Sequence, residues 1–491
     1  RRNSGYALDL LLDTAPFVQE GAPFNFCKIL GGSEGTLAFF TAIKIDLTPL
    51  PPANKALVCV HFTSLIDSLK ANLVILKHFP TAIELMDDVI LDCTKSNHAL
   101  QPNRFFLVGE PRSVLIVEFA EETGGLLEQK IDETIQDLKS QGFGYAFPVI
   151  RGADIRKVWD LRKAGLGSLA NIPGDSKSVT VIEDIAVPVS KQTEYVIEME
   201  ELFARLGMKC VYHAHVSTGE LHLRPVLNLK DPFDVERFKT VAEESLSIVK
   251  KYGGSLSGEH GDGRLRAAMI PKLLGDHNFQ LINQVKNSFD PDNLFNPGKI
   301  TQAPPMEAFL RSEPGVPTPE VSTLMDFSST LGVVRAAEKC NGSGDCRKSP
   351  QAGGGMCPSY QATRDEKNTT RARANILREY LNRPAHKNPF DHQEIYEILD
   401  LCLSCKACQS ECPSNVNMAK LKAEFLHHWY SSHRIPFRTR VIAYLPYLYQ
   451  IAQPFPHLAN ASMHPGIISS MLKRLIGFHP ERSLPLLSGQ S

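Results

Sequence analysis

The sequence has almost no net charge and no uninterrupted apolar run of membrane-spanning length. Its 53 basic and 54 acidic side chains give a net charge of -1, so there is no bulk field of the kind that attracts nucleic acid or anionic lipid. The longest apolar stretch near the C-terminus, residues 441–455, is interrupted by Pro446 and Pro454 and is unsuited to crossing a bilayer. We expect no transmembrane segment and no nucleic-acid partner.

The sequence does not begin with methionine or with the pattern of a targeting signal. It opens with Arg-Arg-Asn-Ser-Gly-Tyr, which is neither a signal peptide nor a transit peptide, and we expect the sequence to be part of a longer polypeptide. Of its 491 residues, 43% are hydrophobic and 22% are charged. This composition is typical of globular proteins, and the length suffices for about three domains.

The cysteines are not spread as a secreted, disulfide-stabilised protein would require. Of the eleven, seven lie between residues 340 and 412, and four are scattered singly, namely Cys27, Cys59, Cys93 and Cys210. Secreted disulfide scaffolds are short and cysteine-dense throughout. Clustered thiols in a long chain indicate metal ligands in a reducing compartment, so we expect a cytoplasmic protein.

Hydrophobic periodicity predicts an α+β protein. Residues 37–48 form a β-rich run that the prolines of residues 49–52 end. Strand-like runs then alternate with helical patterns, at residues 56–62, 64–78, 114–119, 122–140, 179–187, 189–206 and 210–216. This alternation indicates helices packed on a sheet. Two further helices are predicted, at about 231–251 and 275–288.

Changes in composition divide the chain into four parts. Residues 1–50 are predicted to be the end of one domain, and residues 51–303 an α/β domain. The proline-rich residues 304–325 form a linker. Residues 326–491 are predicted to be helical and are interrupted by a glycine-rich segment at 341–355. The tail after about residue 430 is either a covering of the core or a surface for a partner or for self-association.

The clearest motif is a cysteine run of the ferredoxin type. Its four cysteines, spaced x2, x2 and x3 and followed by Pro413, are Cys402, Cys405, Cys408 and Cys412. In such runs three thiolates bind one cubane, and the cysteine before proline ligates another cluster. Zinc is the alternative because thiolates also suit zinc, but the absence of histidine and the Cys-Pro pair favour iron.

A stretched version of the same run lies upstream, with only three cysteines. They are Cys340, Cys346 and Cys357, the last followed by Pro358. If the usual crossover applies, Cys357 completes the cluster of Cys402, Cys405 and Cys408. Cys340, Cys346 and Cys412 are then one ligand short of a second cubane. We predict one 4Fe-4S cluster and leave the second open.

Histidines and a glutamate form a second constellation. His215 and His222 flank a predicted turn, so their imidazoles are expected to converge from adjacent hairpin strands. Paired strand histidines are more often ordinary than metal-binding unless a third ligand is present. The candidate is Glu259, which stands beside His260 in the glycine-rich segment 257–263.

Five motifs of the chain resemble those of the FAD-linked 2-hydroxyacid dehydrogenases. In chain order they are Asn3-x-Gly5-Tyr6, Gly32-Ser33-Glu34-Gly35-Thr36, His215-x6-His222, Glu259-His260-Gly261 and Asn296-Pro297-Gly298-Lys299. The resemblance covers residues 1–300. Together with the cysteine-rich part, the chain is most similar to the long bacterial D-2-hydroxyglutarate dehydrogenases, which fuse flavin and ferredoxin parts.

The resemblance implies the domain types and the flavin contacts. Residues 1–50 would end a PCMH-type FAD-binding domain, residues 51–303 would be an FAD-oxidase C-terminal cap domain, and an α-helical ferredoxin-type domain would follow. The implied flavin-binding residues are Asn3, Gly5, Tyr6, Gly32, Ser33, Glu34, Gly35, Thr36, Asn296 and Lys299. Because the family's phosphate-cradling loops would precede residue 1, we expect this polypeptide alone to bind FAD poorly.

The resemblance also implies a divalent metal site. His215, His222 and Glu259 would bind zinc or manganese, which would hold the hydroxyl and carboxylate of the substrate, and His260 would be the base. This agrees with the chemistry, because a Lewis acid lowers the pKa of the hydroxyl and a neighbouring imidazole removes its proton.

Two arginines are candidates for binding the carboxylates of the substrate. Arg162 matches the family's carboxylate-binding arginine, although an exposed helix arginine is the alternative. Arg224 is a candidate for a second carboxylate, but the family commonly has asparagine there. The family's Gly-Asp-Gly-Asn between the two histidines is also replaced here, by residues 216–220, which leaves the substrate open.

The expected activity is oxidation of D-2-hydroxyglutarate to 2-oxoglutarate, with the hydride passing to FAD and electrons leaving through a 4Fe-4S cluster to an unnamed acceptor other than NAD. D-lactate and glycolate are the alternative substrates. A non-catalytic electron-transfer fragment is the alternative of another class, because the flavin domain is truncated.

Overall fold

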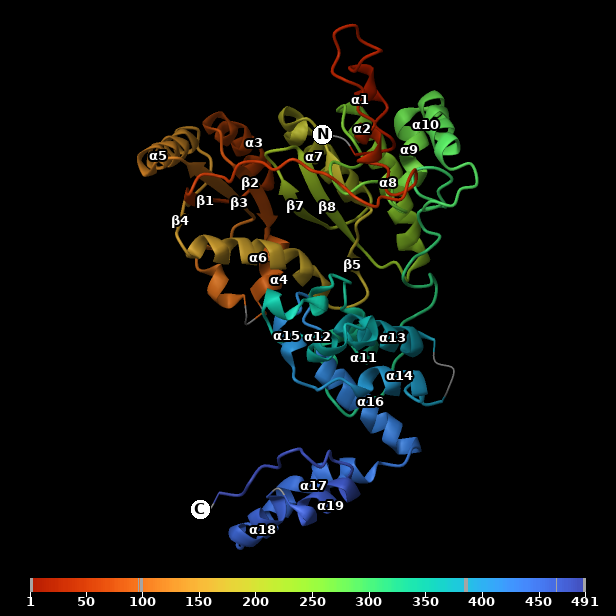
Figure 1. Cartoon of the computed structure of the whole chain (residues 1–491). Coiled ribbons are helices and arrows are strands. Elements are labelled where there is room, and N and C mark those ends of the chain that lie inside the picture. Colours follow the sequence, from red (N-terminus) through yellow and green to blue (C-terminus); the bar gives the residue numbers. More distant parts are fainter. Residues whose placement is uncertain (1–2, 96, 98–99, 384–386, 465, 489–491) are drawn as a thin grey trace.

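The structure is a computed structural model that describes residues 3–95, 97, 100–383, 387–464 and 466–488. It shows a sheet flanked by helices, a helical domain beside it, and a group of three helices at the C-terminal end (Figure 1). None of the helices in these ranges combines the length and the apolar character needed to cross a membrane.

The sheet has eight strands, and all pairs of neighbours are antiparallel. The strands are β1 (Asn54–Phe62), β2 (Ala82–Asp87), β3 (Ser113–Glu121), β4 (Val149–Arg151), β5 (Lys177–Ser178), β6 (Ile182–Ala186), β7 (Cys210–His215) and β8 (Glu220–Leu227). They are ordered β4-β1-β3-β2-β7-β8-β5, with β6 also paired to β8.

One face of the sheet is covered by four helices that form the main core. They are α3 (Leu65–Ile75), α5 (Gly124–Ser140), α7 (Gln192–Arg205) and α8 (Pro232–Lys251). Three of them begin at a capping side chain, where Ser64, Thr123 and Asp231 accept hydrogen bonds from the first turn. Such caps satisfy backbone donors that a helix leaves open. These helices and strands β1, β3, β6 and β7 lie close to their predicted positions.

The opposite face of the sheet is covered by two helices that the sequence patterns did not single out. They are α4 (Asp88–Lys95) and α6 (Asp154–Ser168), which pack on alternate residues of the strands, such as Leu57 and Ile116. Successive strand residues point to opposite faces, so the two cores lie back to back. The candidate site lies on this second face.

The N-terminal residues share a small core with the last two helices of the sheet domain. Tyr6 and Leu37 pack with Ile270 and Ile282 of α9 (Ile270–Leu274) and α10 (Asp276–Phe289). Two short helices, α1 (Asp9–Leu12) and α2 (Cys27–Leu30), belong to the same segment.

The predicted β-rich run at residues 37–48 is wrong. In the structure this segment forms no strand, and its large apolar side chains after Leu37 are exposed, with Phe39 at 80% and Leu47 at 89% of full exposure. A strand is stable only with a hydrogen-bonded neighbour, and none of the described strands pairs with this segment.

The second domain is helical and has its own core. Its helices are α11 (Val333–Glu338), α12 (Pro358–Thr363), α13 (Thr370–Asn382), α14 (Gln393–Asp400), α15 (Ala407–Glu411) and α16 (Met418–Ser432). The last and longest, α16, directly follows the cysteine run. Residues 304–325, predicted to be a linker, contain neither helix nor strand.

A close contact and a group of ion pairs are among the contacts between the two domains. A Cβ added at Gly167, near the end of α6, would lie 2.3 Å from the Cβ of Pro413. Lys230 Nζ lies 3.0 Å from an oxygen of Asp175 and 2.9 Å from one of Glu338. Because Glu338 is in α11, these pairs hold the helical domain against the sheet domain.

Beyond α16 the chain forms three helices that lie apart from the sheet domain and from the core of the helical domain (Figure 1). They are α17 (Phe437–Ala452), α18 (Pro456–Met463) and α19 (Ile467–Ile476). Many of their large apolar side chains are exposed, including Tyr444 and Leu475. This tail is therefore not a covering of the core in the described part of the chain.

Candidate active site

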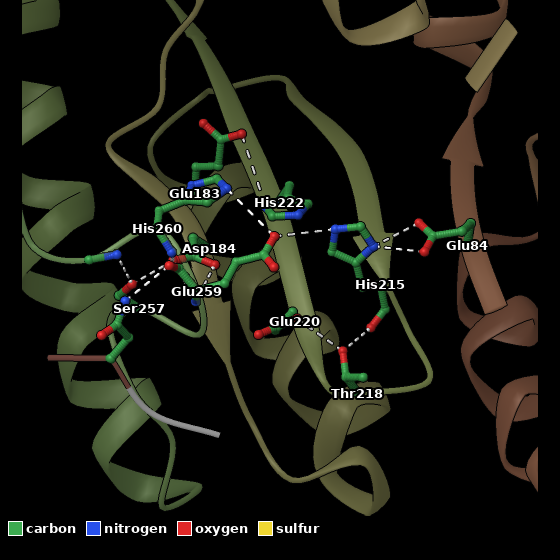
Figure 2. A network of polar contacts seen from close by, with 12 residues as sticks. Glu84, Glu183, Asp184, His215, Thr218, Glu220, His222, Ser257, Glu259 and His260 are labelled. Carbon is green, nitrogen blue, oxygen red and sulfur yellow. Dashed lines mark hydrogen bonds and ion pairs between the residues drawn. The ribbon is translucent and has the colours of Figure 1, made fainter. Parts of the chain in front are cut away.

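Three histidines lie on one face of the β7–β8 hairpin. His213 and His215 alternate along β7, and His213 is paired across the strands with His222. A loop brings Glu259 to this face, where its Oε1 lies 3.4 Å from His215 Nε2 (Figure 2). His260 Nε2 lies 3.7 Å from the same oxygen, and its ring stacks on His222 with centroids 5.2 Å apart.

The predicted metal ligands are brought together. One ligand atom from each of His215, His222 and Glu259 lies within 4.8 Å of the others. Glu183 and Asp184 form overlapping groups with His222, Glu259 and His260. Two imidazoles and one carboxylate are a typical catalytic zinc set, which leaves a position for substrate. Since Glu259 and His260 are exposed while His222 is buried, the open side of the site faces outward.

Glu84 of β2 orients the first histidine. Its two carboxylate oxygens lie 2.7 and 2.8 Å from His215 Nδ1, and this hydrogen bond raises the pKa of His215. With Nδ1 held by Glu84, the other nitrogen, Nε2, points toward Glu259. A carboxylate behind a histidine is the usual support of a metal-binding imidazole. Glu84 was not singled out from the sequence, because nothing local links it to residue 215.

The second histidine is kept neutral by its surroundings. Burial lowers the pKa of His222 to about 2, and its Nδ1 has no hydrogen-bond partner among the described residues. Metals bind the neutral imidazole. The environment of His222 therefore suits a ligand better than it suits a proton acceptor.

Asp184 holds the loop that carries Glu259 and His260. Its carboxylate accepts hydrogen bonds from Ser257 Oγ at 2.6 Å, from the backbone N–H of His260 at 2.8 Å and from that of Glu259 at 3.2 Å. Asp184 has a φ of 73° at an irregularity of β6 between Glu183 and Ile185. This bulge turns a fully buried carboxylate toward the loop. The sequence offered no signal for it.

The two arginines lie at the rim of the histidine cluster. Arg162, on α6, pairs with Glu84, and its guanidinium lies 3.4 Å from His215 Nδ1. Arg224 lies on β8 beyond His222 and pairs with Glu183 at 2.5 Å. Both guanidinium groups are thus close enough to the cluster to meet a bound acid, and both already contact a protein carboxylate. Their role toward substrate stays a prediction.

His213 is a further histidine of this face that the sequence analysis missed. Neither of its ring nitrogens has a hydrogen-bond partner among the described residues, and burial lowers its pKa. The ring lies beneath the site, 5.3 Å from that of His222. The His213-x-His215 spacing, which places both on one strand face, was the available signal.

The segments predicted to face the flavin pack against the same loop. The side-chain amide of Asn3 donates to the carbonyl of Glu259 at 2.9 Å. The backbone N–H of Gly5 donates to Asp262 Oδ2 at 2.6 Å. Burial raises the pKa of Asp262 to about 6. The N-terminal segment is therefore part of the wall beside His260.

Residues 32–36 form a turn beside that wall. Glu34, with a φ of 51°, accepts hydrogen bonds from the backbone N–H groups of Asp262 at 2.6 Å and Gly263 at 3.1 Å. The side chain of Asn296 donates to the carbonyl of Glu34 at 2.7 Å. Glu34 thus connects two of the predicted flavin-facing segments with the loop that carries Glu259 and His260.

The remaining predicted flavin contacts are neighbours of this turn, except one. The hydroxyls of Tyr6 and Thr36 are hydrogen-bonded at 2.6 Å, and Ser33 is buried. Gly32 lies against Asn3, where an added Cβ would stand 3.2 Å from Asn3 Oδ1, whereas nothing lies within 4 Å of a Cβ at Gly35. Lys299 is half-buried farther along the chain. Contact of any of these residues with flavin stays a prediction.

The cysteines fall into the two sets expected from crossover. One pocket is lined by Cys357, Cys402, Cys405 and Cys408. Within it, the Sγ of Cys357 accepts a hydrogen bond from the backbone N–H of Thr370 at 3.1 Å. Such N–H donors to sulfur tune the potential of a cluster. This pocket suits one cubane.

The remaining three cysteines, Cys340, Cys346 and Cys412, form the other set, and all three are buried. Burial, and to a smaller extent the charges of Cys340 and Cys346, raise the pKa of Cys412 to about 11. Nearby thiols of this kind ionise when they bind a metal centre. Three thiols are therefore present at the second set, as expected.

The spacing of the thiols disfavours zinc. A tetrahedral zinc with Zn–S distances of about 2.3 Å holds its sulfur ligands roughly 3.8 Å apart. Among the described residues, no group of three cysteine sulfurs lies within 4.8 Å of one another. A cubane has its ligands at four corners and separates them further, so the cysteine sets suit clusters better than single ions.

Two protein families account for most of the chain. Residues 51–300 match the family of FAD-linked oxidases, C-terminal domain. Residues 336–416, which include all seven clustered cysteines, match the 4Fe-4S dicluster domain. The two matches support FAD and 4Fe-4S clusters as cofactors. They say nothing of a divalent metal.

Curated relatives are similar to this chain over most of its length. The chain is 28% identical to D-2-hydroxyglutarate dehydrogenase of Pseudomonas putida over 95% of its length, and 27% identical to that of Escherichia coli over 96%. Each match covers 50% of the relative. The glycolate oxidase subunit GlcD of Bacillus subtilis is 24% identical over 60% of this chain and 60% of that protein. The chain spans about half the length of the first two relatives.

The family match and the geometry coincide in one region. The histidine hairpin, the Glu259 loop and both rim arginines all lie within residues 51–300, the part matched by the oxidase family. That match covers half of the chain, and the cluster-binding domain follows it after the linker. The chain therefore belongs to the FAD-linked oxidases, whose C-terminal domain it carries together with a 4Fe-4S dicluster domain.

Proposed function

We propose that this chain is the substrate-binding and electron-exporting part of a flavin-dependent D-2-hydroxyacid dehydrogenase, with D-2-hydroxyglutarate as substrate and 2-oxoglutarate as product. The observation that carries the proposal is the convergence of His215, His222 and Glu259 within 4.8 Å beside an exposed His260. The relatives named D-2-hydroxyglutarate dehydrogenase support the choice of substrate.

Each residue of the site has a role in this proposal. His215, His222 and Glu259 hold a divalent cation, zinc or manganese, while Glu84 keeps the first imidazole in the correct tautomer. His260 removes the proton of the 2-hydroxyl. When bound, the cation supplies Lewis-acid polarisation of that hydroxyl, and FAD supplies acceptance of the C2 hydride.

The arginines are proposed to select the acid. Arg162 lies beside the metal-site histidine and binds the carboxylate next to the reacting carbon, releasing part of its contact with Glu84. Arg224 lies farther along the same strand face and binds the distal carboxylate of a dicarboxylic acid. A guanidinium suits both tasks because it binds two carboxylate oxygens at once.

Electrons leave through the helical domain. We propose that the cluster of Cys357, Cys402, Cys405 and Cys408 and a second cluster at Cys412 relay them to an acceptor other than NAD. The contact of Gly167 with Pro413 supports this route, because it joins α6, which carries Arg162, to the residue after Cys412. From Arg162 to Gly167 the helix rises by only about 8 Å.

The division of labour follows the domain boundaries proposed from the sequence. Residues 1–50 supply one wall of the flavin site, residues 51–303 the substrate site, residues 304–325 the linker, and residues 326–491 the clusters and the tail. The separate cores of the sheet domain and the helical domain support this division.

A monocarboxylic substrate such as D-lactate or glycolate is the second candidate. The similarity to a glycolate oxidase subunit over 60% of the chain favours it. The two candidates differ in their need for a second cationic side chain. D-2-hydroxyglutarate requires one for its second carboxylate, and D-lactate does not.

A substrate panel on the full-length protein tests the proposal. Turnover is measured with D-2-hydroxyglutarate, D-lactate and glycolate and an artificial electron acceptor, for the wild type and for Arg224→Met. We expect the highest kcat/KM on D-2-hydroxyglutarate and a selective loss of that activity in the variant. Equal or better turnover of D-lactate would overturn the choice of substrate. A full-length protein without turnover of any of the three acids would overturn the proposed enzymatic activity.

A further inference from the structure

The two cysteine loops of the helical domain are related position by position. The second loop has cysteines at 402, 405 and 408, each separated by two residues. In the first loop the same spacing gives Cys340, Ser343 and Cys346. A serine thus stands where the complete motif has its middle cysteine, Cys405.

The backbone of the two loops repeats the same pattern around that position. Both neighbours of Cys405 have positive φ, 53° at Ser404 and 65° at Lys406. Both neighbours of Ser343 have positive φ as well, 82° at Gly342 and 79° at Gly344. Positive φ is uncommon at residues other than glycine, such as Ser404 and Lys406. The first loop has glycine at both matching positions. These matches identify the same turn in both loops.

The elements that follow the turn also correspond. Lys406 is the N-cap of α15, and Cys408 is the second residue of that helix. Gly344 is the N-cap of the short 3-10 helix Asp345–Arg347, and Cys346 is its second residue.

Burial agrees with this alignment. Cys405 is exposed at the rim of its pocket, whereas Cys408 is buried. Ser343 is likewise exposed, and Cys346 is buried. The partner from the other loop is buried in both sets, as Cys357 or Cys412.

We propose that Ser343 is the fourth ligand of the second cluster, so that three cysteine thiolates, Cys340, Cys346 and Cys412, and one serine oxygen hold this cubane. The hydroxyl loses its proton to solvent as Oγ bonds to iron, and the oxidation state of the cluster does not change. Three buried thiolates and one exposed oxygen make one iron chemically different from the other three.

The exposed corner faces the contact between the domains. Cys340 and Ser343 line a cleft that Lys163, Gly167 and Arg224 of the sheet domain close from the other side. An oxygen ligand is harder and binds iron of a cluster less well than thiolate does. The iron at Ser343 is therefore the one that leaves first, and it leaves into this cleft.

The test uses the full chain, purified anaerobically and reconstituted with iron and sulfide. Mild oxidation with ferricyanide takes one electron and releases one Fe2+ from a cubane whose corner lacks a thiolate, which leaves a three-iron cluster visible by EPR. We expect this signal in the wild type and its loss in Ser343→Cys, where the fourth thiolate is restored. Ser349→Cys, in the same loop but outside the spacing, is the control and should behave as the wild type.

Two outcomes would overturn the proposal. One is an unchanged three-iron signal in Ser343→Cys. The other is iron and sulfide sufficient for one cubane only, with the reduced signal of the Cys357 cluster intact. The inference rests on the second cluster of the proposed function and not on its substrate, so failure of the hydroxyacid panel leaves these measurements unaffected.

Discussion

The cysteine-rich region and the proposed metal site of the sheet are built in opposite ways. The cysteines come from one short part of the chain, where turns and helix starts set their spacing. The histidine site collects His215, His222 and Glu259 from a hairpin and a distant loop, and it needs Glu84 and Asp184 from two further strands to orient them. A local motif binds its cofactor through sequence spacing, whereas the second site depends on the whole sheet.

This contrast predicts where substitutions are felt. A change at a ligand of the sheet site affects the bound metal directly, a change at a supporting carboxylate acts through geometry, and a change at the domain contact acts on the path between the sites. Four variants separate these levels, and their expected effects decrease in that order.

His222→Ala removes a buried ligand of the sheet site. We expect loss of stoichiometric divalent metal and a fall in kcat of roughly 10³-fold, because a Lewis acid contributes several kcal/mol to such a reaction. Metal content and turnover of the full-length protein are the measurements. His277→Ala, on an exposed part of α10, is the control. A His222→Ala protein with wild-type metal content would remove this residue from the site.

Asp184→Asn tests the support of the loop. Asparagine tolerates the positive φ of this position, so the backbone is retained while the charge that binds three donors is lost. We expect metal affinity to fall by about 10- to 100-fold, the usual effect of losing such support.

Metal titration of this variant beside Asp132→Asn, an exposed change on α5, is the measurement. Unchanged affinity in Asp184→Asn would show that the loop keeps its position without the carboxylate.

Gly167→Ala tests the contact between the domains. The new Cβ would stand 2.3 Å from Pro413, and such overpacking costs about 1–3 kcal/mol. We expect a lower Tm and slower reduction of the clusters after flavin reduction, with little change in metal affinity. Gly124→Ala, where nothing lies within 4 Å, serves as control. Equal cluster reduction rates in both variants would place the electron path elsewhere.

Asp175→Asn addresses the ion pairs between the domains and their dependence on pH. Burial alone would raise the pKa of Asp175, but hydrogen bonds from Arg335 and Lys230 outweigh it and hold the pKa well below its usual value. A depressed carboxyl pKa stabilises the folded state above the unfolded pKa of about 4, and this contribution is lost as the pH falls through the folded pKa.

Because the group is partly exposed, screening reduces the expected loss in Asp175→Asn to about 1 kcal/mol. Urea unfolding should show a constant difference from the wild type between about pH 8 and pH 5 that shrinks below about pH 4. A difference that grows as the pH falls would contradict this assignment.

The sequence predicted the cysteine site, which depends on local spacing, better than the histidine site, which depends on the folded sheet. The Cys402 run and its crossover with Cys357 were predicted from spacing, and the structure groups the thiols in that way. The hairpin of His215 and His222 was also predicted, since apolar alternation and a turn mark it. Glu84 and Asp184 escaped because their role exists only after β2 and β6 lie beside the hairpin. The strand predicted at 37–48 failed because alternation alone does not supply a neighbouring strand.

We propose that electrons from a D-2-hydroxyacid pass through flavin to the clusters of this chain. Rapid anaerobic mixing of the full-length protein with D-2-hydroxyglutarate, followed by absorbance and by freeze-quench EPR, tests it most directly. We expect bleaching of the flavin and then the signal of a reduced cluster within the time of one turnover. Flavin that is reduced and reoxidised by acceptor while every cluster stays oxidised would contradict it.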